Sequence, residues 1–253
     1  MIKKSVIGGG VFAVLLCGMT ASAAPEPQVL DPLFRADASE TRAALLIQDG
    51  KIIEKRYAPG YSDANRFISW SMAKTVTAVL IGELVADGRL QLDAPVPFAE
   101  WQAPGDPRRK ITLRQMLNMA SGLSHTEVGD PVYASDTNQI LFVGGTETMA
   151  QAALAKPLEA MPGSKFEYSS MTSLLLSELI TRQLTQRRDP RVRAEAYRRF
   201  AEDRLFRPAG ITSAVLEFDG AGTQIGGSIL YLSLDDWGRF GKVLLDGRGD
   251  AAT

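Results

Sequence analysis

Ser71 and Lys74 stand three residues apart in a segment that predicts the start of a helix. Residues at this spacing share one face of a helix. Apolar residues recur at helical spacing after them and stop at an Asp-Gly pair, so we expect a helix over about residues 71–86. Ser71 would lie in its first turn, where unpaired backbone N–H groups and the helix dipole favour negative charge. A hydroxyl there, with an amine one turn further on to take its proton, is a nucleophile and base that need no histidine.

The Ser-x-x-Lys pattern has low specificity by itself, because a chain of this length contains it by chance about once. Its other interpretation is a helix-capping serine followed by a lysine in solvent. Further segments are needed to decide between the two.

The chain has one histidine, His125, so a histidine-based triad would rest on this residue alone. His125 lies in the polar, turn-rich stretch 123–146, which we expect to form a loop that borders a site. For His125 itself we expect a surface position without a catalytic role, rather than a place at the rim of the site.

The elements that must position these residues begin with a hairpin. Two strand-like runs, 43–48 and 51–57, flank an Asp-Gly pair, which is a strong hairpin signal. Capping residues and apolar periodicity predict four further helices, at 113–119, 147–155, 170–184 and 187–205. An early hairpin followed by helices predicts an α/β protein in which most of the sheet comes later in the chain.

The predicted helix 187–205 carries many arginines interleaved with glutamates. Such a run can form a basic face for nucleic acid or a helix surface covered by salt bridges, and we favour the salt-bridged surface. The formal net charge of −1 gives no electrostatic reason to expect nucleic acid or an anionic membrane as a partner.

Composition excludes several other classes of protein. A chain of 253 residues with 45% hydrophobic and 23% charged residues is typical of a globular protein of one or two domains. One cysteine and one histidine argue against a structural zinc site, and we expect neither a metal nor a cofactor.

The N-terminus predicts a secretory signal peptide. Two lysines precede an apolar stretch at 6–19, and small residues lead to a cleavage site after Ala23. The stretch is too short to span a membrane comfortably. A lipid anchor on Cys17 is the alternative, and the bulky Leu16 before it argues against that alternative.

Three further segments occur in a specific order after Ser71-Met72-Ala73-Lys74. They are Thr-Leu-Arg-Gln-Met-Leu-Asn-Met-Ala-Ser-Gly-Leu at 112–123, Pro-Gly-Ser-Lys-Phe-Glu-Tyr-Ser-Ser at 162–170, and the run from Gly226 to Gly241. Together these segments resemble the serine beta-lactamase and penicillin-binding-protein superfamily. Within it they are most similar to class C-related serine hydrolases, including esterases and 6-aminohexanoate-dimer hydrolases. The resemblance covers about residues 43–247 and implies an α/β (α+β) fold, with an antiparallel sheet flanked by helices and a helical subdomain.

Carried onto this sequence, the resemblance implies a role for four residues. Ser71 becomes the acylated nucleophile, Lys74 its base, and Tyr168 the residue that passes a proton to the leaving group. Ser170 stands where the family's Tyr-x-Asn motif has asparagine, and it becomes a candidate substrate-binding residue. Serine keeps a hydroxyl but loses the reach of the carboxamide. The Tyr-Ser-Ser form is closer to the amide-oligomer hydrolases and esterases than to true beta-lactamases.

The family's third motif, Lys-Thr-Gly or His-x-Gly, does not occur after Tyr168. In the family this motif lies on a strand that supplies one of two oxyanion-hole donors, and loss of one such donor lowers turnover about 10²–10³-fold. We therefore expect that the C-terminal strands are missing from this chain.

These observations predict a signal peptide at 1–23, an extended lead-in at 24–42 and one incomplete hydrolase domain at 43–253.

The predicted function is hydrolysis of small-molecule amides or esters through an acyl-enzyme on Ser71. Within the enzyme class the alternative is a D,D-peptidase or beta-lactamase. Outside it, the alternative is a catalytically silent cell-wall-binding or regulatory protein of the same fold, or an inactive fragment. We expect secretion to the bacterial periplasm, with no nucleic acid and no membrane as partner after signal cleavage. The sequence does not determine the oligomeric state.

Overall fold

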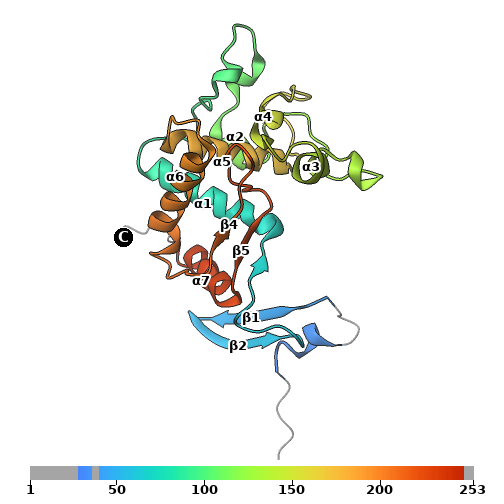
Figure 1. Ribbon diagram of the computed structural model, residues 1–253, viewed down its shortest axis with the longest axis vertical. Coiled ribbons are helices and arrows are strands. Elements are labelled where there is room, and N and C mark those ends of the chain that lie inside the picture. The colour runs from blue at the N-terminus through green and yellow to red at the C-terminus, as the bar shows by residue number, and fades with distance from the viewer. Residues whose placement is uncertain (1–27, 36–39, 248–253) are drawn as a thin grey trace, which may run out of the picture.

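The computed structural model describes residues 28–35 and 40–247 of the chain. The predicted signal peptide lies outside the described residues. In the described part, most of the helices gather at one end of the molecule, and the first hairpin lies at the other end next to α7 (Figure 1). The combination of helices with antiparallel strands agrees with the predicted α+β organisation.

The first sheet is the predicted hairpin. Strand β1 (Ala43–Gln48) pairs with antiparallel β2 (Lys51–Tyr57). Asp49 and Gly50 form the turn with φ of 49° and 73°. Positive φ at both central residues is what a tight hairpin turn of matching twist requires, and Asp-Gly supplies it at low cost.

The second sheet has the order β3-β5-β4 and is antiparallel throughout. Its strands are short: β3 (Phe67–Ile68), β4 (Val215–Leu216) and β5 (Leu230–Leu232). Because β3 ends two residues before Trp70, its pairing with β5 fixes where the segment that carries Ser71 begins.

Helix α5 lies at the centre of the helical part and packs against its neighbours α1, α2, α4 and α6 (Figure 1). The α-helices are α1 (Ala73–Ala86), α2 (Leu113–Leu117), α3 (Asp136–Asn138), α4 (Met149–Leu154), α5 (Ser170–Leu184), α6 (Pro190–Ala201) and α7 (Leu234–Leu245). The short 3₁₀ segments are 31–34, 70–72, 99–101, 107–110 and 132–134, and π-helical turns cover 139–143 and 202–206. None of the helices within the described ranges is both long enough and apolar enough to cross a membrane.

Several predicted boundaries differ from the structure. The helix expected at 113–119 ends at Leu117, and Met119 just after it has a φ of 54° that no helix allows. The helix expected at 187–205 begins only at Pro190 and continues after Ala201 as a π-helical turn. The lead-in was expected to be extended, which is wrong for Asp31–Phe34, a 3₁₀ turn.

Part of the arginine-rich region forms salt bridges, as the sequence favoured. Arg199 pairs with Glu195 one turn away, at 2.7 Å. Arg204 reaches back to Glu83 on α1, also at 2.7 Å. These pairs place carboxylates against the arginines, so the charges neutralise one another on the protein itself.

The loop before β5 passes close to both α1 and α5 at Gly226. A Cβ atom at this position would overlap the hydroxyl groups of Thr77 on α1 and Ser177 on α5. The backbone oxygen of Gly226 also accepts a hydrogen bond of 2.9 Å from the Thr77 hydroxyl. Only glycine therefore allows the loop to lie this close to the two helices.

We predict that Gly226→Ala destabilises the fold by about 1–3 kcal/mol, because the added methyl group overpacks a closed contact. The matched control is Gly82→Ala on α1, where no neighbouring heavy atom lies within 4 Å of the new Cβ. There alanine should stabilise the helix by roughly 0.5–1 kcal/mol. Chemical denaturation measures both effects. Equal effects at the two glycines would show that the packing at Gly226 is not as described.

Candidate active site

Ser71 lies in the 3₁₀ turn Trp70–Met72, directly before α1. The turn is fixed by Ser69, whose N–H donates to the Leu230 oxygen at 2.8 Å and whose hydroxyl accepts from the Leu230 N–H at 3.1 Å. Trp70 has a φ of 40°, a left-handed conformation that costs a non-glycine residue about 1–2 kcal/mol. The flanking strand pairing holds this strained turn, and Ser71 is exposed at its end.

The side-chain nitrogen of Lys74, one turn into the helical segment, makes three hydrogen bonds. It lies 3.2 Å from Ser71 Oγ, 3.0 Å from Ser170 Oγ and 2.6 Å from the backbone oxygen of Gly227. The three acceptors come from the turn before α1, from the N-terminus of α5 and from the loop before β5. Lys74 is therefore half-buried and held from three sides.

Tyr168 also lies beside Lys74, but through its ring. The Lys74 nitrogen is 4.8 Å from the centroid of the tyrosine ring, within the range of a cation–π contact. Among the described residues, no hydrogen bond joins the Tyr168 hydroxyl to Ser71 or Lys74. The structure thus places the ring of Tyr168 beside the Lys74 amine, while the Tyr168 hydroxyl is hydrogen-bonded to neither Lys74 nor Ser71.

Ser170 is the first residue of α5 and is 3% exposed. The preceding residue, Ser169, caps the helix by accepting from the Thr172 N–H at 3.0 Å. The Ser170 hydroxyl donates to Glu127 Oε1 at 2.6 Å, and its backbone N–H donates to Glu127 Oε2 at 2.8 Å. Ser170 therefore stands between Lys74 and Glu127, and its expected contact with substrate stays a prediction.

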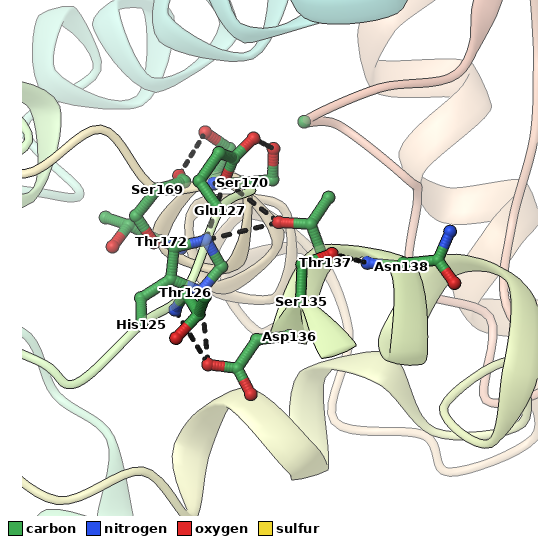
Figure 2. Close-up of polar contacts among 12 residues, drawn as sticks. His125, Thr126, Glu127, Ser135, Asp136, Thr137, Asn138, Ser169, Ser170 and Thr172 are labelled. Atoms are coloured by element: carbon green, nitrogen blue, oxygen red, sulfur yellow. Dashed lines mark hydrogen bonds and ion pairs between the residues drawn. The ribbon is translucent and has the colours of Figure 1, made fainter. Parts of the chain in front are cut away.

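His125 is buried, so the prediction of a surface histidine is wrong. Its side chain is 1% exposed, and its Nε2 lies 2.6 Å from Glu127 Oε2 (Figure 2). The Thr137 hydroxyl donates to the same carboxylate oxygen at 2.9 Å. His125 Nδ1 has no hydrogen-bond partner among the described residues. A hydrogen on Nε2 is assigned because this nitrogen faces a carboxylate.

The loop 123–146 borders the candidate site, as expected, and polar contacts fix its shape. Thr126 and Asp136 bond to each other twice, through Thr126 N–H to the carboxylate at 2.8 Å and Asp136 N–H to the Thr126 oxygen at 2.9 Å. Lys156 pairs with the same carboxylate at 2.6 Å. These contacts close the loop on itself and turn His125 and Glu127 inward (Figure 2).

Glu127 was missed by the sequence reasoning, because no spacing rule links a loop glutamate to a helix start 43 residues later. Burial raises the pKa of the Glu127 carboxyl, but hydrogen bonds from His125, Ser170 and Thr137 outweigh burial and lower the pKa to about 2. The N-terminus of α5 adds a favourable dipole. Glu127 is therefore ionised at neutral pH.

This arrangement can deprotonate a hydroxyl. An amine within hydrogen-bond reach of an exposed serine is the geometry that a nucleophile and its base require. In the ranges 28–35 and 40–247, no three His, Cys, Asp or Glu side chains lie close enough together to hold a metal ion.

Comparison with solved structures shows the same fold. A candidate 6-aminohexanoate-dimer hydrolase from Bacillus anthracis is similar with 21% identity and a TM-score of 0.67, over 87% of this chain and 57% of that chain. A D-stereospecific amidohydrolase from Streptomyces sp. is similar with 23% identity and a TM-score of 0.57, over 77% and 65%. A D-amino acid amidase from Ochrobactrum anthropi SV3 gives 19% identity and a TM-score of 0.52, over 74% and 57%.

The chain thus spans 57% of the length of the first of these structures, with a beta-lactamase/transpeptidase-like fold. The family model described as Beta-lactamase matches residues 30–249, nearly all of the part that the structure describes. The match and the shared fold agree with the resemblance that the four sequence segments carry, and the chain belongs to the Beta-lactamase family of hydrolases.

Proposed function

We propose that the protein is a serine hydrolase of small amides or esters that forms an acyl-enzyme on Ser71. The observation that carries this proposal is the 3.2 Å contact between Lys74 Nζ and Ser71 Oγ at the start of α1. The exposed position of Ser71 supports it, because a substrate carbonyl must reach the hydroxyl from solvent. The unpaired N–H groups of the first helical turn favour the negative charge that develops during attack.

In the proposed reaction, Ser71 Oγ attacks the carbonyl carbon of the substrate while its proton passes to the lone pair of Lys74. The bond from the carbonyl carbon to the leaving group then breaks, and the leaving group takes the proton that Lys74 received from Ser71. Tyr168, whose ring lies against the Lys74 nitrogen, is the proposed carrier of that proton. Water afterwards hydrolyses the ester on Ser71 and frees the acid.

The proposed substrate class draws on the names of the similar structures. By name they include a 6-aminohexanoate-dimer hydrolase, a D-stereospecific amidohydrolase and a D-amino acid amidase. The Tyr-Ser-Ser form at residues 168–170 resembles that of the amide-oligomer hydrolases and esterases, which supports small amides or esters as the substrate class. The predicted signal peptide would bring the protein to the periplasm.

Two other functions share parts of this site. A D,D-peptidase or beta-lactamase would use the same nucleophile and base, and family membership favours it as the second candidate. A silent cell-wall-binding protein would keep the fold without turnover. The contact of Lys74 with both Ser71 and Ser170 argues against silence, because a binding protein needs no amine at the hydroxyl.

The nucleophile is tested with a fluorophosphonate that labels activated serines in the purified full-length protein. We predict that Ser71→Ala abolishes labelling and ester hydrolysis, because Ser71 is the exposed hydroxyl in contact with Lys74 Nζ. Lys74→Ala should keep the fold and slow labelling about 10²–10⁴-fold, the range that a general base contributes. If Ser71→Ala is labelled as strongly as the wild type, Ser71 is not the nucleophile. If the wild type is not labelled at all, the catalytically silent binding protein is favoured.

A substrate panel distinguishes the enzyme alternatives. We predict that a short p-nitrophenyl ester is hydrolysed fastest, an aminohexanoate dimer more slowly and a cephalosporin slowest, because an ester needs less help with its leaving group. Initial rates with each substrate, with Ser71→Ala as the blank, measure the order. A cephalosporin rate above the ester rate would instead make the protein a beta-lactamase.

A further inference from the structure

The amine of Lys74 has a fixed number of hydrogens to share among its three partners. As an ammonium group lysine has three N–H donors, whereas the neutral form that a general base requires has two N–H donors and one lone pair. The Gly227 oxygen, at 2.6 Å, can only accept, so it takes one donor. The other two partners are hydroxyls, which can each donate or accept, so the direction of their hydrogen bonds decides where the lone pair points.

The direction at Ser170 is set by Glu127. An ionised carboxylate only accepts, so the 2.6 Å bond to Glu127 Oε1 consumes the single hydroxyl hydrogen of Ser170. Ser170 Oγ must then accept from Lys74 at 3.0 Å. In the neutral form that a general base requires, both donors of the amine are then in use, which leaves the lone pair to face the Ser71 hydroxyl 3.2 Å away.

We propose that Glu127 is a positioning residue that acts through Ser170 to hold the lone pair of Lys74 toward Ser71. This inference rests on the proposed function, since it explains how Lys74 is ready to act as a base. Glu127 does not touch Ser71 or Lys74 in the described hydrogen-bond network, and its effect passes through one hydroxyl.

The carboxylate is itself held in one orientation. Its Oε2 accepts from the backbone N–H of Ser170, from Thr137 and from His125, while Oε1 accepts from the Ser170 hydroxyl (Figure 2). The backbone N–H cannot reverse its direction. These donors lower the pKa of Glu127 to about 2 against the effect of burial, which keeps the group an acceptor throughout the neutral range.

The charge of Glu127 also matters after the proton transfer. When Ser71 attacks, the O–H bond breaks and Lys74 becomes an ammonium group with three donors for its three acceptors. The carboxylate stands beyond Ser170, across hydrogen bonds of 3.0 and 2.6 Å, and attracts the new positive charge. The proton does not pass to Glu127, because a carboxyl of such low pKa does not compete for it.

Glu127→Gln tests the direction of the hydrogen bonds at the Ser170 hydroxyl, because glutamine has nearly the same shape as glutamate. The amide nitrogen cannot face the fixed N–H of Ser170, so it must face the Ser170 hydroxyl and donate to it. Ser170 would then turn its own hydrogen to the lone pair of Lys74 and displace Ser71. We expect single-turnover acylation by a p-nitrophenyl ester to slow about 10- to 100-fold, the value of a hydrogen bond to a charged group.

The loss should appear in the maximal acylation rate and not in the substrate concentration at half-maximum, because Glu127 does not contact the substrate. Ser170→Ala removes the connecting hydroxyl, so in that background Glu127→Gln should have no further effect on acylation. The control for a charge change elsewhere is Glu195→Gln, which neutralises an exposed carboxylate on α6 that pairs with Arg199.

Two results would overturn the proposal while the proposed function stands. One is that Glu127→Gln folds and acylates as fast as the wild type, while acylation of the wild type is shown to require Ser71. The other is that Glu127→Gln slows acylation of the Ser170→Ala variant by the same factor as it slows that of the wild type. Glu127 would then act by a route other than the Ser170 hydroxyl. If the wild type itself does not acylate, the proposed function fails and this inference fails with it.

The ionised state of folded Glu127 is tested without activity. Its pKa is lower in the folded than in the unfolded chain, where it is about 4.5, so the unfolded chain takes up the proton first as pH falls. The stabilisation is complete above pH 4.5 and is lost as pH falls toward 2. We expect the difference in unfolding free energy between wild type and Glu127→Gln to shrink from pH 6 to pH 2.5, measured by urea denaturation. A constant difference would mean that Glu127 is not held as a carboxylate and would overturn the proposal.

Discussion

The half-buried amine of Lys74 depends on three hydrogen-bond partners from three separate parts of the chain. An amine taken out of water must recover its hydrogen bonds inside the protein, because an unpaired buried donor costs free energy. Ser71, Ser170 and Gly227 are these partners, and they lie around the amine only if α1, α5 and the loop before β5 pack together. The close approach at Gly226 and the burial of α5 are therefore conditions for the site as well as for stability.

A second constraint is the charge of Glu127 at the start of α5. A carboxylate in this position satisfies free N–H groups of the helix, and the helix dipole stabilises it in return. Glu127 lies in an irregular part of the loop, ahead of its short helical turns, and the paired bonds between Thr126 and Asp136 hold that part in place. The loop can thus hold the Glu127 carboxylate at the site because hydrogen bonds within the loop satisfy its backbone polar groups.

The fold and the chemistry rest on different observations. Similarity at 19–23% identity establishes the fold that this chain shares with an amidohydrolase and an amidase. The chemistry rests on the exposed serine at a strained turn and on the amine beside it. The same fold accommodates many reactions, so the residues around Lys74 carry the functional argument. The ring of Tyr168 against the amine is one such local feature, since it shields one side of the nitrogen.

The sequence by itself determined the local structure and three of the residues at the amine. Asp49-Gly50 determined the hairpin, because its two residues tolerate the positive φ that the turn requires. The helical spacing of Ser71 and Lys74 determined their contact, and the capping serine at position 169 determined where α5 starts. Tertiary structure decided the remainder. The place of Glu127 behind Ser170 and the Gly227 oxygen at Lys74 depend on contacts between segments 43 and 153 residues apart. Periodicity and capping describe only neighbours along the chain, so no pattern in one sequence could predict these contacts.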